Sequence, residues 1–196
     1  TWITDEIQLN NSVKPTYQKQ IKNKTYYQII KNLEPSFEQQ QKIFQRCKKK
    51  DIIFLSTPYD KKSVDFLDNL GVKAFKISSS DMTNHILLKH IVKKKKPIIL
   101  STGLSDFLQV QNTVKFLQRL NMKNKLILMQ ATSNYPTPPD DVNLLVIPEY
   151  IKTFDLPIGF SDHTKNSIAS LGAVALGACV LEKHFTLSRN LSGPDQ

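Results

Sequence analysis

The sequence is short of cysteine and has no long apolar run. Its 196 residues include only two cysteines, Cys47 and Cys179, which excludes a disulfide-stabilised scaffold and is typical of a reducing compartment. No apolar stretch approaches the ~18–20 residues that cross a bilayer, and no basic-then-apolar leader follows Thr1. We therefore expect a cytoplasmic protein without a membrane partner. Because the first residue is not methionine, we also expect a processed chain or part of a longer protein.

Glycine and signals for nucleic-acid binding are also scarce. The six glycines form neither a GxGxxG nor a GxxxxGK[ST] phosphate loop. Lysine and arginine total 27 against 17 acidic residues, for a net charge of +10. The lysine clusters at 48–50 and 93–96 each end a predicted helix, where cations suit the negative end of the helix dipole. Without an RGG tract or zinc-finger spacing, the charge indicates a solvated face, and we expect no nucleic-acid partner.

Short apolar runs rich in Ile, Val and Leu alternate with helical patterns from residue 52 onward. Their spacing of about 20 to 30 residues is that of a βα unit. The runs are nearly continuous, as in parallel strands that are buried on both faces. The predicted strands are Ile52–Leu55, Ala74–Ile77, Pro97–Leu100, Leu126–Met129, Pro157–Phe160 and Ala178–Leu181.

Apolar residues at helical spacing predict the helices between these strands. One stripe ends at Leu70 and is followed by Gly71, a typical C-terminal stop. The predicted stripes are Val64, Leu67 and Leu70; Leu87, Leu88, Ile91 and Val92; Val110, Val114 and Leu117; and Ile168, Leu171, Ala175 and Leu176.

The chain divides into a polar arm and a regular region. Residues 1–35 are polar and without a convincing period, which predicts an arm with one short helix around Tyr26–Ile30. Ser36 and Gln39 then match a capping box that opens a helix. Residues 36–196 are therefore predicted to form the folded α/β region.

Strands joined by helices predict right-handed crossovers and a parallel sheet. The two candidate folds are an open doubly wound sheet and a (β/α)8 barrel. Polar residues follow every predicted strand, which favours the barrel, because its active site is built from all the βα loops. Six strands cannot close an eight-stranded barrel. We therefore predict an incomplete (β/α)8 TIM barrel.

Small hydroxyl groups recur where the predicted strands end. The residues are Ser56, Thr57, Ser78, Ser79, Ser80, Ser101, Thr102, Thr132, Ser133 and Ser161. Lys76 lies within the second strand. A phosphate or carboxylate is bound by several short donors and a cation, which this ring supplies. Serine and threonine also favour turns and helix caps, but their recurrence at so many strand ends indicates an anion site.

Two histidines close adjacent predicted strands. Because neighbouring strands lie ~4.8 Å apart, inward-facing rings of His163 and His184 can share one metal ion. Alternation places Ser161 on the face of His163 and Glu182 on the face of His184, where Glu182 is expected to orient that ring. Two nitrogens with further positions open suit Mn, Mg or Co better than a closed structural zinc site.

Six sequence blocks between residues 56 and 196 match a known family. They are STPYD at 56–60, FKISSSDMTN at 75–84, KPIILSTGLS at 96–105, TSNYPTPPDDVNL at 132–144, PIGFSDHT at 157–164 and GACVLEKHFTLSRNLSGPDQ at 177–196. In these blocks the sequence closely resembles the sialic acid synthase (N-acetylneuraminate synthase) family. The resemblance implies a divalent metal, usually manganese, and the condensation of phosphoenolpyruvate with an N-acetylated hexose such as N-acetylmannosamine. The products would be a nine-carbon 2-keto acid and phosphate.

The resemblance also implies roles for individual residues. His163 and His184 would bind the metal. Asp81 would take the acidic position near the reacting centre, while Tyr135 and Asp195 would lie on the sugar side. The residues that would hold the carboxylate and phosphate of phosphoenolpyruvate are Thr57, Lys76, Ser79, Ser101, Ser133 and Ser161. Full-length members would form homodimers.

The same resemblance implies that parts of the family pattern are missing. Strands three to eight of the barrel match, whereas the first two strands, the last helix and a C-terminal antifreeze-like domain have no counterpart. We therefore expect that this chain by itself is not a competent enzyme. Two alternatives stay open. One is a non-catalytic remnant that binds metal or phosphoenolpyruvate, or associates with a full-length subunit. The other is a phosphoenolpyruvate aldol synthase that makes a legionaminic, pseudaminic or 2-keto-3-deoxy sugar acid.

Overall fold

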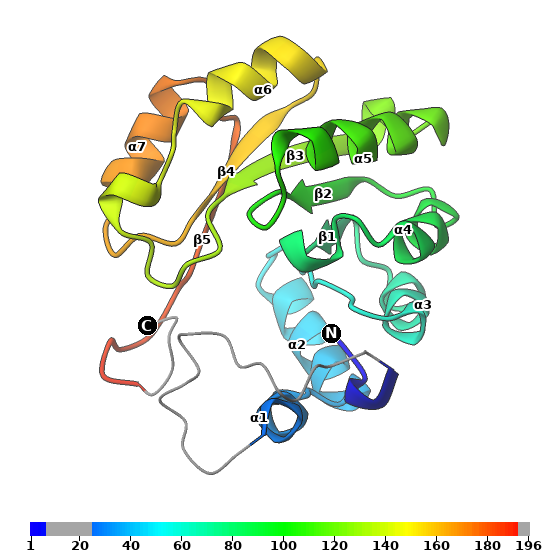
Figure 1. The fold of residues 1–196 in the computed structure, drawn as a ribbon. Coiled ribbons are helices and arrows are strands. Elements are labelled where there is room, and N and C mark those ends of the chain that lie inside the picture. The colour runs from blue at the N-terminus through cyan, green and yellow to red at the C-terminus, as the bar shows by residue number, and fades with distance from the viewer. Residues whose placement is uncertain (7–24, 192–196) are drawn as a thin grey trace.

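The computed structural model describes residues 1–6 and 25–191, and among them five strands form one parallel sheet. The strands pair in sequence order, and the sheet curls into a half-barrel with α3 to α7 around its outer side (Figure 1). The strands are β1 (Phe75–Ile77), β2 (Ile98–Ser101), β3 (Leu126–Ala131), β4 (Ile158–Asp162) and β5 (Val180–Lys183). The helices are α1 (Tyr26–Leu33), α2 (Phe37–Lys49), α3 (Lys61–Leu70), α4 (His85–Val92), α5 (Phe107–Arg119), α6 (Val146–Phe154) and α7 (Ile168–Ala175). None of these helices has the length and hydrophobicity to cross a membrane.

The register of the strands separates two faces of the sheet. Ile77, Leu100 and Leu128 lie side by side on successive strands and are fully buried in the core beneath the helices. Because strand side chains alternate, the next positions point to the other face, which is concave. Lys76 and Ser161 therefore lie on the concave face, on β1 and β4. The core thus fills the helix side of the sheet and leaves polar groups on its concave side.

Local signals set the ends of several helices as predicted. Both halves of the capping box form at the start of α2, between Ser36 and Gln39. Gly71 ends α3 in the left-handed conformation with φ of 90°, which glycine adopts without a steric penalty. The short helix predicted around Tyr26–Ile30 is found as α1.

The first predicted strand, Ile52–Leu55, is not a strand in the structure. Residues 52–59 carry no regular secondary structure, and the side chains of Ile52 and Ile53 are 62% and 71% exposed. An apolar run becomes a strand only where a neighbouring strand supplies hydrogen-bond partners. Among the described residues, β1 pairs with β2 alone, so this run does not pair with the other edge of β1. Five of the six predicted strands are therefore found.

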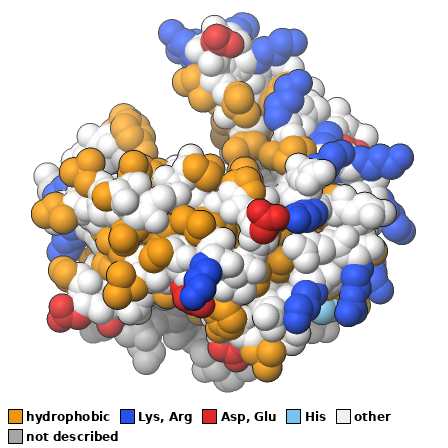
Figure 2. All heavy atoms as spheres, turned by 90° about the horizontal axis from the view of Figure 1, so that it is seen from above, with side chains coloured by type: hydrophobic (Ala, Val, Ile, Leu, Met, Phe, Trp, Pro, Cys, Tyr) orange, Lys and Arg blue, Asp and Glu red, His pale blue; other side chains and the backbone are white. Residues whose placement is uncertain are grey.

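The predicted face of the last helix is also wrong. Ile168 and Leu171 on α7 are 74% and 71% exposed, whereas Ala169, Ser170 and Ala173 are buried. Small residues on the inner side let the helix backbone approach the sheet closely, and the large side chains then point outward. Figure 2 shows hydrophobic side chains spread over the face that α5, α6 and α7 present when the molecule is seen from above.

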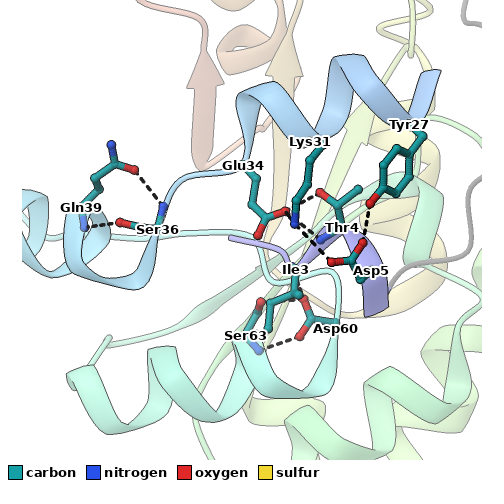
Figure 3. Close-up of polar contacts among 10 residues, drawn as sticks. All are labelled: Ile3, Thr4, Asp5, Tyr27, Lys31, Glu34, Ser36, Gln39, Asp60 and Ser63. Carbon is teal, nitrogen blue, oxygen red and sulfur yellow. Dashed lines mark hydrogen bonds and ion pairs between the residues drawn. The ribbon is translucent and has the colours of Figure 1, made fainter. Parts of the chain in front are cut away.

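The N-terminal residues are joined to the folded region by polar contacts (Figure 3). The Ile3 N–H donates to Asp60 Oδ2 at 2.8 Å, and the Thr4 N–H donates to Glu34 Oε2 at 3.0 Å. Asp60 also caps α3 by accepting from the Ser63 N–H at 2.8 Å. One buried carboxylate therefore serves both the start of a helix and the first residues of the chain.

Asp60→Ala is expected to destabilise the protein more than Ser36→Ala, although each removes a helix N-cap. Loss of the exposed Ser36 cap should lower the free energy of unfolding by about 1 kcal/mol. Asp60→Ala should lower it by about 2–3 kcal/mol, because the Ile3 N–H also loses its partner. Urea unfolding followed by circular dichroism measures both changes. Equal losses in the two variants would contradict a stabilising role for the Ile3 contact.

Candidate active site

An ion pair spans the concave face of the sheet. Lys76 Nζ on β1 lies 3.2 Å from Glu182 Oε1 on β5. These are the first and fifth strands in the sheet order, and in a flat sheet they would lie about 19 Å apart at ~4.8 Å per strand. The ion pair therefore forms because the sheet curls, and it lies on the concave face that carries the candidate site.

Three of the predicted anion donors form two contacts at the carboxyl ends of β1, β2 and β3. Its Nζ donates to Ser101 Oγ at 2.7 Å, and Ser101 is buried. Ser79 and Ser133 lie in the loops that follow β1 and β3, and their hydroxyl oxygens are 3.1 Å apart. At Gly103 an added Cβ would lie 2.7 Å from Ser133 Oγ, so glycine allows the loop after β2 to approach Ser133. Ser101 thus contacts Lys76 directly, while Ser79 and Ser133 contact each other after β1 and β3.

Thr57 is held separately from this group. Its carbonyl accepts a hydrogen bond from the Thr1 amino group at 2.6 Å. Within the described residues, no hydrogen bond joins the Thr57 side chain to Lys76 or to the serines. Its expected contact with an anion at Lys76 stays a prediction.

The two histidines lie side by side at the carboxyl ends of β4 and β5. The ring centroids of His163 and His184 are 5.4 Å apart, and the ring planes are inclined by 65°. Tyr135, in the loop after β3, contacts both rings, with centroid distances of 4.3 Å to His163 and 5.6 Å to His184. The structure therefore brings together three of the residues that the sequence predicted for the metal and sugar side.

A backbone carbonyl sets the tautomer of His163. Its Nδ1 lies 2.6 Å from the Thr132 carbonyl oxygen, which can only accept a hydrogen bond. Nδ1 therefore carries the proton of the neutral ring, and Nε2 keeps its lone pair. Burial is the main reason why the pKa of His163 lies below its ordinary value, so the ring is neutral at pH 7. No side-chain motif in the sequence indicates this partner, because it is a main-chain atom.

The Ser161 hydroxyl stands between two acceptors. Its Oγ donates to Glu182 Oε1 at 2.6 Å and lies 3.2 Å from His163 Nε2. A hydroxyl has one proton, and here that proton lies in the hydrogen bond to the Glu182 carboxylate. The Nε2 lone pair consequently faces an oxygen that has no proton to donate. Glu182, expected from the sequence to orient His184, contacts Ser161 and Lys76 on this face, and its role toward His184 stays a prediction.

Asp81 lies in the turn after β1, beside Ser79. Burial raises the pKa of the Asp81 carboxyl, and hydrogen bonds from Asn84 Nδ2 at 3.0 Å and from Ser80 Oγ at 3.4 Å only partly offset this effect. A carboxylate with a raised pKa is a stronger base than an ordinary aspartate. Asp195, the other predicted catalytic acid, lies outside the described residues.

Comparisons with known proteins identify the relatives of the chain. The NeuB family model matches residues 1–196. The chain is 44% identical to an N,N'-diacetyllegionaminic acid synthase of Campylobacter jejuni, over 86% of the chain and 51% of that protein. It is 37% identical to the N-acetylneuraminate-9-phosphate synthase of Homo sapiens, over 93% of the chain and 50% of that protein. The chain thus spans about half the length of these curated relatives.

A solved structure shows the same fold. The crystal structure of an N-acetylneuraminic acid (sialic acid) synthetase from Leptospira borgpetersenii, in complex with citrate, superposes with a TM-score of 0.82. It is 32% identical, and the match covers 86% of this chain and 59% of that one. The family resemblance predicted from the sequence is confirmed. The chain belongs to the NeuB family.

Proposed function

We propose that this chain carries the residues that bind phosphoenolpyruvate and the metal ion in a synthase that makes a sialic-type sugar acid. The reaction is the condensation of phosphoenolpyruvate with an N-acetylated hexose of the N-acetylmannosamine type, with release of phosphate. In the same proposal β1 to β5 are strands four to eight of a (β/α)8 barrel, and residues 52–55 take the place of the third. The observation that supports it is the presence of two groups on one concave face. They are the pair His163 and His184 and the Lys76 cluster, by which we mean Lys76, Ser79, Ser101 and Ser133.

The Lys76 cluster suits an anion that carries a carboxylate and a phosphate. Lys76 contributes one positive charge, and Ser79, Ser101 and Ser133 contribute hydroxyl donors. Glu182 balances the charge of Lys76, and the Lys76 side chain is only 13% exposed. The ammonium is therefore partly desolvated, and it lies on the concave face. Such preorganised donors stabilise the charge that develops on departing phosphate.

The histidine pair suits a divalent cation. His163 presents an Nε2 lone pair that no hydroxyl proton occupies, and the Thr132 carbonyl holds its ring in that tautomer. His184 lies beside it and would supply the second nitrogen. The family resemblance favours Mn, with Mg or Co as alternatives, and the positions that two imidazoles leave open would suit the oxygen ligands of such an ion. When bound there, the cation would polarise the aldehyde oxygen of the sugar.

The remaining roles concern protons and placement. The C2–C3 double bond of the enolpyruvate supplies the electron pair for the new bond from C3 to the sugar aldehyde carbon, and the aldehyde oxygen takes up a proton to become a hydroxyl. Water adds to C2 and loses its protons, and the C2–O bond to phosphate breaks to leave the 2-keto group. Asp81, with its raised pKa, is suited to take the proton of that water. Tyr135, which lies against both imidazoles, would border the sugar. Asp195 would share the acid–base role.

Two further functions are favoured by specific observations. The 44% identity to a legionaminic acid synthase makes a diacetylated legionaminic-type hexose the alternative acceptor. The other candidate is binding of metal or phosphoenolpyruvate without turnover, for which the Lys76 contacts and the two histidines would suffice. Phosphate release is measured with phosphoenolpyruvate, Mn and either N-acetylmannosamine or the diacetylated hexose, and calorimetry measures the binding of phosphoenolpyruvate and Mn. Release with one of the two sugars identifies the acceptor, whereas binding without release from either supports binding without turnover.

His184→Ala is expected to lower the affinity for Mn by at least ~100-fold, because a single imidazole is left to bind the ion. The matched control is His90→Ala on α4, where His90 Nε2 contacts Asp65 Oδ1 at 2.7 Å, outside the site. Its Mn affinity should equal that of the parent. Titration of Mn followed by its electron paramagnetic resonance signal measures both. Retained affinity in His184→Ala would show that the metal assignment is wrong.

Lys76→Met is expected to weaken phosphoenolpyruvate binding by about 10- to 100-fold, because it removes a charge-assisted contact of about 1.5–3 kcal/mol. Lys115→Met removes the same charge from an exposed position on α5 and should leave the affinity unchanged. Calorimetric titration at constant ionic strength compares them. Equal weakening in the two variants would mean that net charge alone attracts the ligand.

A further inference from the structure

Asp162 is a buried carboxylate to which the proposed reaction gives no role. It ends β4 with a side chain that has no exposed surface. Its oxygens accept hydrogen bonds from Ser170 Oγ on α7 and from the Thr164 N–H at 2.8 Å. Lys183 Nζ on β5 lies 3.0 Å from the same carboxylate. Burial by itself would raise the pKa of Asp162, but these hydrogen bonds outweigh it and the pKa lies below its ordinary value.

Asp162 and Lys183 hold the same residue from two sides. They face each other in the β4–β5 register. Lys183 Nζ donates to the Thr164 carbonyl at 2.7 Å, while Asp162 accepts from the Thr164 N–H. Both polar atoms of the Thr164 backbone are therefore occupied by this pair. The chain just after His163 is fixed on both sides as it leaves the strand.

The pair also lies directly behind the two histidines. His163 follows Asp162 and His184 follows Lys183 in the sequence. Alternation directs Asp162 and Lys183 to the helix side of the sheet and the residues next to them to the concave side. Among the described strands, β5 pairs with β4 alone, and Leu181, Glu182 and Lys183 are exposed. The ion pair thus adds a side-chain link between the two strand ends that carry the imidazoles.

We infer that the Asp162–Lys183 pair is a positioning device for the two-histidine centre. It holds the ends of β4 and β5 in one relative position, so that His163 and His184 keep the separation that a shared cation requires. This inference rests on the proposed metal site. It assigns a function to residues that touch neither the cation nor the substrate.

Lys183→Met tests the inference, because it removes the ammonium and keeps the aliphatic stem. The Mn affinity should fall about 10-fold or more, the loss that is typical when a group that supports a ligand is removed. Lys183→Arg should restore the affinity to within about 3-fold of the parent, since a guanidinium can donate to both Asp162 and the Thr164 carbonyl. The control is Lys123→Met, which breaks an exposed ion pair with Asp155 and should change nothing.

The outcomes separate the inference from the function on which it rests. If the parent chain binds Mn and Lys183→Met binds it equally well, the positioning role is wrong and the metal site stands. If Lys183→Arg loses as much affinity as Lys183→Met, the positioning role is also wrong. If the parent chain itself fails to bind Mn, the proposed metal site is wrong and the inference falls with it. Should Lys183→Met not fold, as judged by circular dichroism, Asp162→Asn removes the same ion pair and should show the same loss.

Discussion

The curl of the five-stranded sheet is the constraint on which the site depends. Lys76 and Glu182 belong to strands that three others separate, and they meet only because the sheet bends around its concave face. The apolar layer of Ile77, Leu100 and Leu128 packs under the helices on the outer side. The curl brings charged and hydroxyl groups from different strands together on the concave face.

On the concave face, charged side chains and hydroxyl groups are paired with one another. Lys76 and Glu182 form an ion pair, and the Ser161 hydroxyl donates a hydrogen bond to the Glu182 carboxylate. His163 stays neutral because it is buried, and its Nε2 faces no donor. The site therefore presents a cationic group toward an anion and, beside it, an electron pair toward a cation. These two features are the ones on which the proposed function rests.

Much of the framework was predictable because it arises from local patterns. Buried parallel strands need continuous apolar runs, and five of the six predicted runs are strands. The strand predicted at 52–55 is absent because a strand requires a hydrogen-bonded neighbour, and a local apolar pattern carries no information about that neighbour. The apolar stripe of α7 was assigned to the wrong face for a related reason. Which side of a helix faces the sheet depends on close packing, and here small residues such as Ala169 and Ala173 take that side.

The sequence by itself determined where the polar side chains lie relative to the strands. Hydroxyl groups follow several strands, one lysine lies within a strand, and two histidines follow neighbouring strands. It also carried the motifs that mark the NeuB family. Only the tertiary structure decided that Glu182 reaches Lys76, that the Thr132 carbonyl sets the tautomer of His163, and that Asp162 and Lys183 grip Thr164. These contacts join residues 19 to 106 positions apart, or involve main-chain atoms. Their geometry follows from the curl and register of the whole sheet, which no local stretch of sequence encodes.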